Sequence, residues 1–182
     1  MKRVLLVAGI LFISVVSTAC INNFAVQELN TKAKSFIENG DYSSAVERLK
    51  SSIDLDPSAF ESYYNLAVAY TKLEDYSSAF ENYKKVIELK SDFADGYYSL
   101  AVCEENLISD LENGDVVIDD NGKLLKAEDK KLKKMSEAER NFLNGLKVDA
   151  VANYEKYLSL NPQAEDKDDV QERISILSEE SK

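Results

Sequence analysis

The side chains that most often perform chemistry in proteins are scarce in this chain of 182 residues. It contains no histidine, so it lacks both the usual general base and the commonest metal ligand. The serine pairs Ser43-Ser44 and Ser77-Ser78 have no base that could activate a hydroxyl as a nucleophile. We therefore expect no catalytic residues and no enzymatic activity.

One acidic stretch has the residue types of a cation site. Part of it follows the spacing of a calcium-binding EF-hand loop, with Asp119, Asn121, Gly122 and Glu128. Val117 and Leu125 stand where such a loop needs oxygen ligands, so too few oxygens are present. A solvated acidic loop is the better interpretation, and we expect neither a metal ion nor a cofactor.

The N-terminus offers a different chemistry, the covalent modification of a cysteine. Lys2 and Arg3 precede an apolar run over residues 4–16. At about 13 residues this run is short for a membrane-spanning helix and has the length of a signal-peptide core. Small residues then lead to a cysteine, in the order Ser17-Thr18-Ala19-Cys20.

This ending resembles the lipobox of bacterial lipoproteins, although Ser17 replaces the usual leucine. The resemblance implies a signal peptide over 1–19 and acylation of Cys20, for instance with palmitate. A tether over 20–25 would then hold the protein to a membrane of the bacterial cell envelope, on its periplasmic or extracytoplasmic face. An ordinary cleaved signal and an uncleaved anchor, with Cys20 unmodified, are the alternatives.

The charge balance limits the partners. The net charge is −11, whereas binding to nucleic acid needs clustered Lys and Arg on one face. An acidic surface also disfavours adhesion to anionic lipid. We expect no nucleic-acid partner, and membrane contact only through the N-terminus. Cys103 stands among Leu100, Ala101 and Val102, which predicts a small buried apolar side chain rather than a redox centre.

A repeated motif organises the rest of the chain. Asp41-Tyr42-Ser43-Ser44-Ala45 recurs unchanged as Asp75-Tyr76-Ser77-Ser78-Ala79, an offset of 34 residues. A fixed period of this size indicates stacked supersecondary units. Apolar residues fall at helical spacing on both sides of each copy. Asp41 is the expected N-cap of a helix that ends before Pro57.

The positions around this motif resemble the tetratricopeptide repeat. One unit reads Tyr63-x₂-Leu66-Ala67-x₂-Tyr70, Ala79-x₃-Tyr83 and Val86. The unit before it reads Leu29-x₂-Lys32-Ala33-x₂-Phe36, Gly40, Ala45-x₃-Leu49, Ser52 and Pro57. A last one is recognised in Ala138, Gly145, Ala150-x₃-Tyr154, Tyr157 and Pro162. Lys32, Ser91 and Glu104 depart from the pattern.

The resemblance implies an all-α protein whose antiparallel helix pairs stack as a short right-handed α-solenoid over 26–162. The units lie near 26–59 and 60–93, followed by a third that an insertion at about 109–134 interrupts. The small residues Ala33, Ala45, Ala67 and Ala79 let paired helices approach closely. Stacked units need polar ends, and 163–182 is the expected capping helix.

The insertion has the pattern of a small β-hairpin. Val116-Val117-Ile118 and Lys123-Leu124-Leu125 flank Asn121-Gly122, which favours a type I′ turn. A lone hairpin is marginal in water, so it packs on the helices or stays mobile. The lysine-rich residues that follow are expected to continue as a helix. Ser136 and Glu139 offer a capping box for a new helix.

In structures of this family the first helix of each pair lines a concave groove. Carried onto this sequence, the groove positions are Asn30, Lys34, Tyr64, Val68, Tyr98 and Val102. The Lys, Asn and Arg clamp with which some members grip a terminal carboxylate is absent here. We therefore expect a hydrophobic or aromatic-rich protein or peptide partner.

Three other interpretations of the groove stay open. Tyr64 and Tyr98 could pack between helices rather than meet a partner. The array could self-associate, with another copy in the groove. The hairpin could instead form a lid over the two tyrosines, above a small apolar ligand.

Overall fold

Seven helices and a two-stranded sheet make up the part of the chain that the computed structural model describes, residues 22–119, 123–127 and 135–180. The first helix covers residues 22–38. The others are α2 (Tyr42–Leu55), α3 (Phe60–Lys72), α4 (Tyr76–Leu89), α5 (Ala94–Asn113), α6 (Glu137–Leu160) and α7 (Lys167–Glu180). The strands are β1 (Val116–Ile118) and β2 (Leu124–Lys126).

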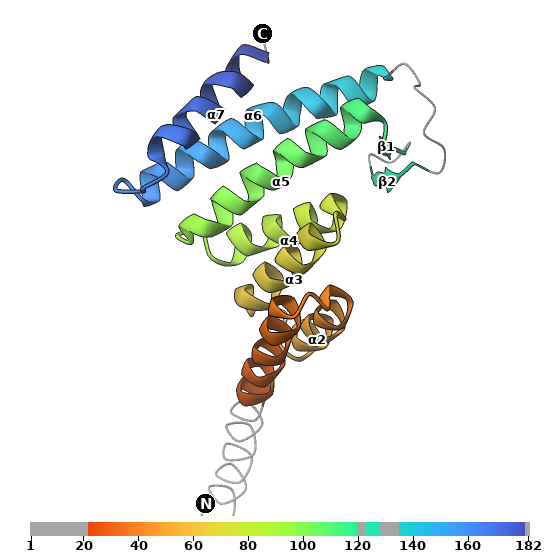
Figure 1. The fold of residues 1–182 in the computed structure, drawn as a ribbon, viewed down its shortest axis with the longest axis vertical. Coiled ribbons are helices and arrows are strands. Elements are labelled where there is room, and N and C mark those ends of the chain that lie inside the picture. The colour runs from red at the N-terminus through yellow and green to blue at the C-terminus, as the bar shows by residue number, and fades with distance from the viewer. Residues whose placement is uncertain (1–21, 120–122, 128–134, 181–182) are drawn as a thin grey trace, which may run out of the picture.

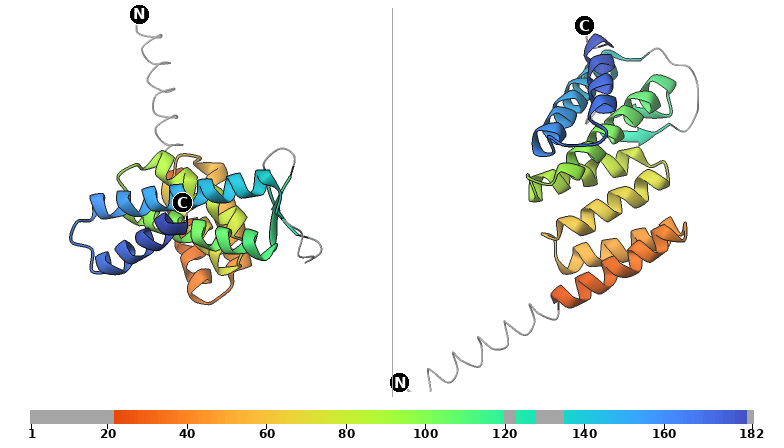
Figure 2. Two further views of the ribbon diagram at one scale, coloured as in Figure 1. Left: turned by 90° about the horizontal axis from the view of Figure 1, so that it is seen from above. Right: turned by 60° about the vertical axis from the view of Figure 1, so that its left-hand side comes forward.

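The helices form antiparallel pairs stacked one on the next (Figure 1). The helix over 22–38 packs on α2, α3 on α4, and α5 on α6, while each pair also contacts its neighbour. Figure 2 shows the same array from two other sides. The predicted all-α fold of stacked helix pairs is confirmed.

The repeated pentapeptide begins the second helix of a pair in both copies. The backbone amide of Ser44 donates to Asp41 Oδ1 at 3.1 Å, and that of Ser78 donates to Asp75 Oδ1 at 3.1 Å. The predicted N-cap is therefore present twice. The residue before each cap is left-handed, Gly40 with φ +78° and Glu74 with φ +56°. The same turn therefore precedes both helices. At Glu74 it lacks the glycine that best suits a left-handed backbone.

Small residues hold the helices together closely. Ala33, Ala45, Ala67 and Ala79 are all fully buried, at 0 % exposure. A side chain larger than a methyl group would push the helix axes apart at these points. The predicted role of the alanines in close helix packing agrees with this burial.

The third pair is longer than the others. Helix α5 has 20 residues and α6 has 24, whereas α3 and α4 have 13 and 14. Helix α5 runs on through residues 109–113, where the insertion was expected to begin, and ends at Gly114 with φ +72°. Helix α6 starts from the predicted capping box of Ser136 and Glu139. The third unit is therefore an extended helix pair, with the hairpin joining its far ends.

The predicted hairpin is present. Strands β1 and β2 are antiparallel, with Val117 opposite Leu125. Val116 is only 7 % exposed and joins the main core, and β1 contacts α5 and α6. This packing supplies the stability that an isolated hairpin lacks. The predicted turn type and the predicted lysine-rich helix fall on residues 120–122 and 128–134, outside the described residues.

The last helix covers the end of the array. Val170 is fully buried and Leu177 is 6 % exposed, and both join the core of the third pair. The opposite side of α7 carries Asp168, Glu172 and Glu179, which are exposed. Helix α7 thus presents a polar outer surface at the C-terminal end.

Two features near the N-terminus bear on anchoring. Residues 22–25, which belong to the predicted tether over 20–25, are helical. Cys20 and the proposed signal peptide lie outside the described residues. No helix within the described ranges is long and apolar enough to cross a membrane.

Candidate functional site

All six predicted groove residues lie on the first helices of the three pairs. The helix over 22–38 carries Asn30 and Lys34, α3 carries Tyr64 and Val68, and α5 carries Tyr98 and Val102. The 34-residue period places each pair of residues one unit after the last. The side chains nevertheless have different surroundings, and these decide what each can do.

Asn30 is turned into the protein. It is 9 % exposed, and its Nδ2 lies within hydrogen-bonding distance of Val26 O (3.0 Å), Ser52 Oγ (2.9 Å) and Ser62 Oγ (2.8 Å). Its Oδ1 accepts from Asn65 Nδ2 at 3.0 Å. Ser52 and Ser62 are fully buried. The amide of Asn30 therefore ties the first helix to α2 and α3, which is first of all a structural role.

A polar pocket opens beside this network. Its volume is about 620 Å³, and its lining includes Asn30, Lys34, Glu61 and Asn65. Lys34 is exposed, and no hydrogen bond or ion pair holds its ammonium group within the described residues. The pocket thus combines a fixed amide network with a free cation and a carboxylate. Such a set suits the backbone and polar side chains of a peptide.

Tyr64 belongs to an aromatic cluster between α3, α4 and α5. Its ring centroid lies 5.1 Å from that of Phe93 and 5.9 Å from that of Tyr83, both edge-on. Its hydroxyl lies 3.4 Å from Ser99 Oγ on α5. The ring is therefore half-buried and fixed by packing, and its remaining surface is rigid before any partner arrives.

Tyr98 has equivalent contacts one unit later. Its ring lies 5.1 Å from that of Tyr157 and 5.9 Å from that of Tyr154, both on α6. Burial first, and then the neighbouring Asp166, raises the pKa of Tyr157 to about 12, so its hydroxyl stays protonated at neutral pH. Tyr64 and Tyr98 thus lie in two separate ring clusters. Both pack between helices, as one of the open interpretations stated, and both keep a partly exposed edge.

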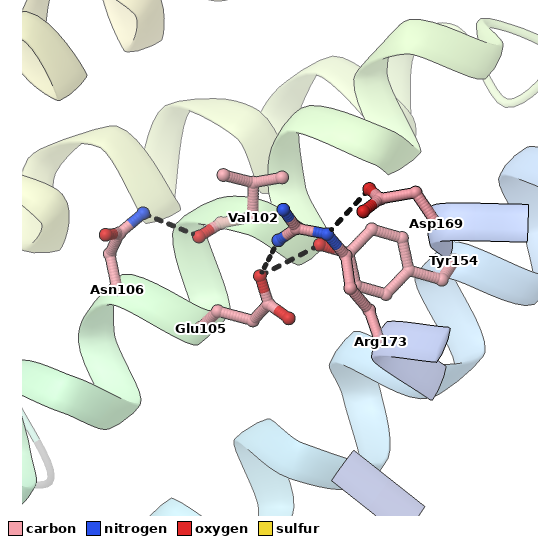
Figure 3. A network of polar contacts seen from close by, with 6 residues as sticks. All are labelled: Val102, Glu105, Asn106, Tyr154, Asp169 and Arg173. Carbon is pink, nitrogen blue, oxygen red and sulfur yellow. Dashed lines mark hydrogen bonds and ion pairs between the residues drawn. The ribbon is translucent and has the colours of Figure 1, made fainter. Parts of the chain in front are cut away.

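Val102 lies next to an ionic network at the C-terminal end of the site (Figure 3). Arg173 on α7 donates from Nη1 to Glu105 Oε2 at 2.7 Å and from Nε to Asp169 Oδ2 at 3.0 Å. The Tyr154 hydroxyl donates to the same Glu105 oxygen at 3.0 Å. The hydrogen bond to Asp169 is the main cause that raises the pKa of Arg173, and the nearby Tyr154 and Glu105 raise it further. The guanidinium of Arg173 is therefore always charged. This network fixes α7 against α5 and α6.

Sequence reasoning missed Asn65, Phe93 and Arg173. Asn65 was visible only as a polar residue beside the apolar Leu66, and the same period aligns it with Thr31 and Ser99 rather than with another amide. Phe93 is the N-cap residue of α5, outside the positions that the repeat pattern specifies. Arg173 gave no signal, because α7 lies beyond the last unit of the period.

The two tyrosines do not line the pocket beside the described part of the hairpin. That pocket, of about 740 Å³, is lined by residues of α3, α4, α6 and the hairpin. Within the described ranges no group of acidic or cysteine side chains is arranged to hold a metal ion. Cys103 is 1 % exposed and its Sγ donates to Tyr76 O, and burial raises its pKa. The predicted buried role of this cysteine is confirmed.

Two models of one family match the chain. One, described as TPR repeat, matches residues 33–74, and the other, described as tetratricopeptide repeat, matches residues 60–93. The first two helix pairs are therefore tetratricopeptide repeats. Among curated protein sequences, none matches this chain.

Solved structures of such repeats share the fold. The first TPR domain of Spaghetti (RPAP3), bound to the HSP90 peptide SRMEEVD, has a TM-score of 0.60 at 16 % identity, over 83 % of this chain and 90 % of that one. The Arabidopsis OM64 TPR domain has a TM-score of 0.61 at 15 % identity, over 85 % of this chain and 98 % of that one. The second TPR domain of human RPAP3, in complex with the HSP70 peptide SGPTIEEVD, has a TM-score of 0.60 at 15 % identity, over 86 % of this chain and 98 % of that one. These matches establish a TPR-type solenoid.

Proposed function

We propose that this protein is a membrane-anchored scaffold or assembly factor that binds a segment of another protein along the first helices of its repeats. It has no catalytic role in this proposal. The TPR fold is a protein-interaction scaffold, and the two RPAP3 domains named above hold short peptides.

The observation that carries the proposal is the pocket of about 620 Å³ between the first helix and α3. It places the ammonium group of Lys34, which has no partner within the described residues, beside the fixed amides of Asn30 and Asn65. The first helices of the next two units carry partly exposed apolar and aromatic side chains, Tyr64 and Val68 on α3 and Tyr98 and Val102 on α5. A polar end followed by an apolar, aromatic stretch matches a peptide with the same order of side chains.

The proposed partner differs in chemistry from the acidic HSP90 and HSP70 peptides bound in those two structures. An acidic peptide would need Lys or Arg side chains along the groove to pair with its carboxylates. The groove positions of α3 and α5 hold apolar and aromatic residues instead, namely Tyr64, Val68, Tyr98 and Val102. The cation at its C-terminal end, Arg173, is already paired with Glu105 and Asp169. A hydrophobic or aromatic-rich segment is therefore the proposed ligand.

The groove is tested by placing a charge in its wall and measuring how much partner protein the variant captures from membranes. Val68→Asp is expected to abolish capture of the bound protein, because a carboxylate would be buried against an apolar segment. Ser51→Asp is the matched control, since Ser51 on α2 is exposed and lines neither pocket. Equal capture by the two variants, with unchanged melting curves, would refute the groove. Light scattering over a concentration series separates self-association from a second protein.

Anchoring through Cys20 is the second part of the proposal. It rests on the resemblance of residues 17–20 to a lipobox and on the preceding apolar run. Cys20→Ala is expected to lose incorporation of labelled palmitate and to leave the membrane fraction. A variant that still incorporates the label or still partitions as the wild type does would contradict the anchoring, without affecting the groove.

A further inference from the structure

Two large apolar side chains are exposed at one end of the first helix pair. Phe24, the third residue of the first helix, is 69 % exposed, and Leu55, the last residue of α2, is 41 % exposed. The two helices are antiparallel, and Ser52 Oγ lies 3.5 Å from Val26 O. Three residues beyond Ser52 therefore bring Leu55 level with the start of the first helix. Single exposed apolar residues are common on proteins, so the place of these two decides what they mean.

Charged side chains are absent from this end of the first helix. Of the whole chain 30 % is Asp, Glu, Lys or Arg, yet none of these occurs between Arg3 and Glu28. Glu28 itself pairs with Lys32 at 2.7 Å. The exposed neighbours of Phe24 are polar but uncharged, namely Asn22, Asn23 and Gln27. An aromatic ring among uncharged polar groups suits the interfacial layer of a bilayer.

The distance to the proposed anchor selects the bilayer as the occupant. The first helix begins at Asn22, two residues after Cys20. Two extended residues span at most about 7 Å, and two helical residues add about 3 Å. The backbone of Phe24 therefore lies within about 10 Å of that of Cys20. The interfacial layer on each side of a bilayer is about 5–8 Å thick, so an acyl chain on Cys20 brings the Phe24 side chain to this layer.

The shape of the array leaves this end free to reach a membrane. In Figure 1 the N-terminal end of the first helix lies at one extreme of the described array, and α7 lies at the other. The second view of Figure 2 shows the same end at the extreme of the array. No other described element extends past it, so a flat bilayer meets this end first.

Two carboxylates limit how deeply this end can enter the bilayer. Asp54 and Asp56 flank Leu55, and Asp54 is exposed. Hydrogen bonds from the hydroxyl and then the amide of Ser58 lower the pKa of Asp56, so it stays charged at neutral pH. Charges are costly in hydrocarbon and are repelled by anionic lipid. The surface therefore fits the headgroup layer of zwitterionic lipid rather than the hydrocarbon core.

We propose that this end of the first helix pair is a membrane-contact surface, with the Phe24 ring in the headgroup layer of the bilayer that holds Cys20. The inference rests on the proposed anchoring and adds a second contact to it. Burial of one phenylalanine favours the bilayer by about 10- to 150-fold. This is enough to orient an anchored protein but too little to hold a free one. The polar pocket, whose lining begins with Asn23, then opens at the membrane surface.

The test uses a single tryptophan as a depth probe in the full chain. The protein contains no tryptophan, so Phe24→Trp introduces the only one, at an exposed position that tolerates it. The variant is purified from membranes and reconstituted into phosphatidylcholine vesicles with bromine, a quencher, at a shallow or a deep acyl position. We expect the emission to shift to the blue and to be quenched most by the shallow bromines. Flotation of the vesicles measures the anchoring separately.

Leu73→Trp is the matched control. Leu73 is 43 % exposed and follows the opposite end of α3, which is 13 residues or about 20 Å long. A tryptophan there should emit as in water and stay unquenched. Protein that floats while the tryptophan at position 24 is unquenched keeps the anchoring and overturns the contact.

The remaining outcomes also decide the proposal. Protein left behind in flotation refutes the anchoring and the contact together. Equal quenching at positions 24 and 73 overturns the contact, because it shows no preferred orientation. A blue-shifted emission at position 24 that no bromine quenches also overturns it, and assigns the surface to another protein or a second copy of the chain.

Discussion

Glu104 is a carboxyl group buried at the centre of the third helix pair, where the repeat pattern has an aromatic residue. It is 2 % exposed, and its Oε2 accepts from Asn153 Nδ2 at 2.9 Å. Burial raises its pKa from 4.5 to about 8, and the nearby Asp149 adds to this, while Asn153 and Lys84 oppose it. The side chain is therefore mostly protonated in the folded protein at neutral pH.

The sign and size of the pH effect follow from this shift. Between pH 4.5 and 8 the folded state holds a proton on Glu104 that the unfolded state has released, so the free energy of unfolding falls as the pH rises. The slope is about 1.4 kcal/mol per pH unit. Glu104→Gln removes this titration and keeps an oxygen for Asn153. We expect its advantage over the wild type to grow by about 3 kcal/mol between pH 5.5 and 8.

Urea unfolding of both proteins over pH 5.5–8.5 measures this difference. Glu47→Gln is the matched control, because Glu47 is an exposed carboxylate on α2, and its curve should stay parallel to that of the wild type. If Glu104→Gln and the wild type also remained parallel over the whole range, the burial of a protonated carboxyl would be refuted.

Three further predictions follow from individual residues. Glu74→Gly should stabilise the protein by about 0.5–1 kcal/mol in urea unfolding, because Glu74 has φ +56°, whereas Gly40→Ala at the equivalent turn should destabilise it. Arg173→Ala should cost about 1–2 kcal/mol, with faster amide exchange in α7, because Glu105 loses its ion-pair partner and keeps only the hydrogen bond from Tyr154; unchanged exchange would contradict this. Cys103 should not react with a thiol reagent until the protein unfolds, because it is 1 % exposed.

The repeat pattern predicts the helix pairs well because it is set by local sequence. The caps at Asp41 and Asp75, the buried alanines and the capping box at Ser136 each depend on a few neighbouring residues. Such signals are visible in a single chain. The lengths of α5 and α6 could not be predicted in this way, because the long third pair is stabilised by contacts with the hairpin and α7.

The groove was predicted less completely, because the period gives the position of a residue but not its surroundings. Asn30 turns inward since the buried hydroxyls of Ser52 and Ser62 offer it partners. Tyr64 is half-buried because Phe93, at the end of the same unit and 29 residues later, packs against its ring. Arg173 comes from a helix outside the period. Each of these contacts joins residues far apart in sequence, which spacing alone does not reveal.

The central claim is that the first helices bind a segment of another protein. Its most direct test places a photoreactive benzoylphenylalanine at Val68 in the groove and, in a second protein, at the exposed Ser51 on α2, with irradiation in intact cells. The account predicts a discrete adduct with a different protein from position 68 that is absent from position 51. Adducts of equal yield from both positions, or adducts only with another copy of this chain, would contradict it.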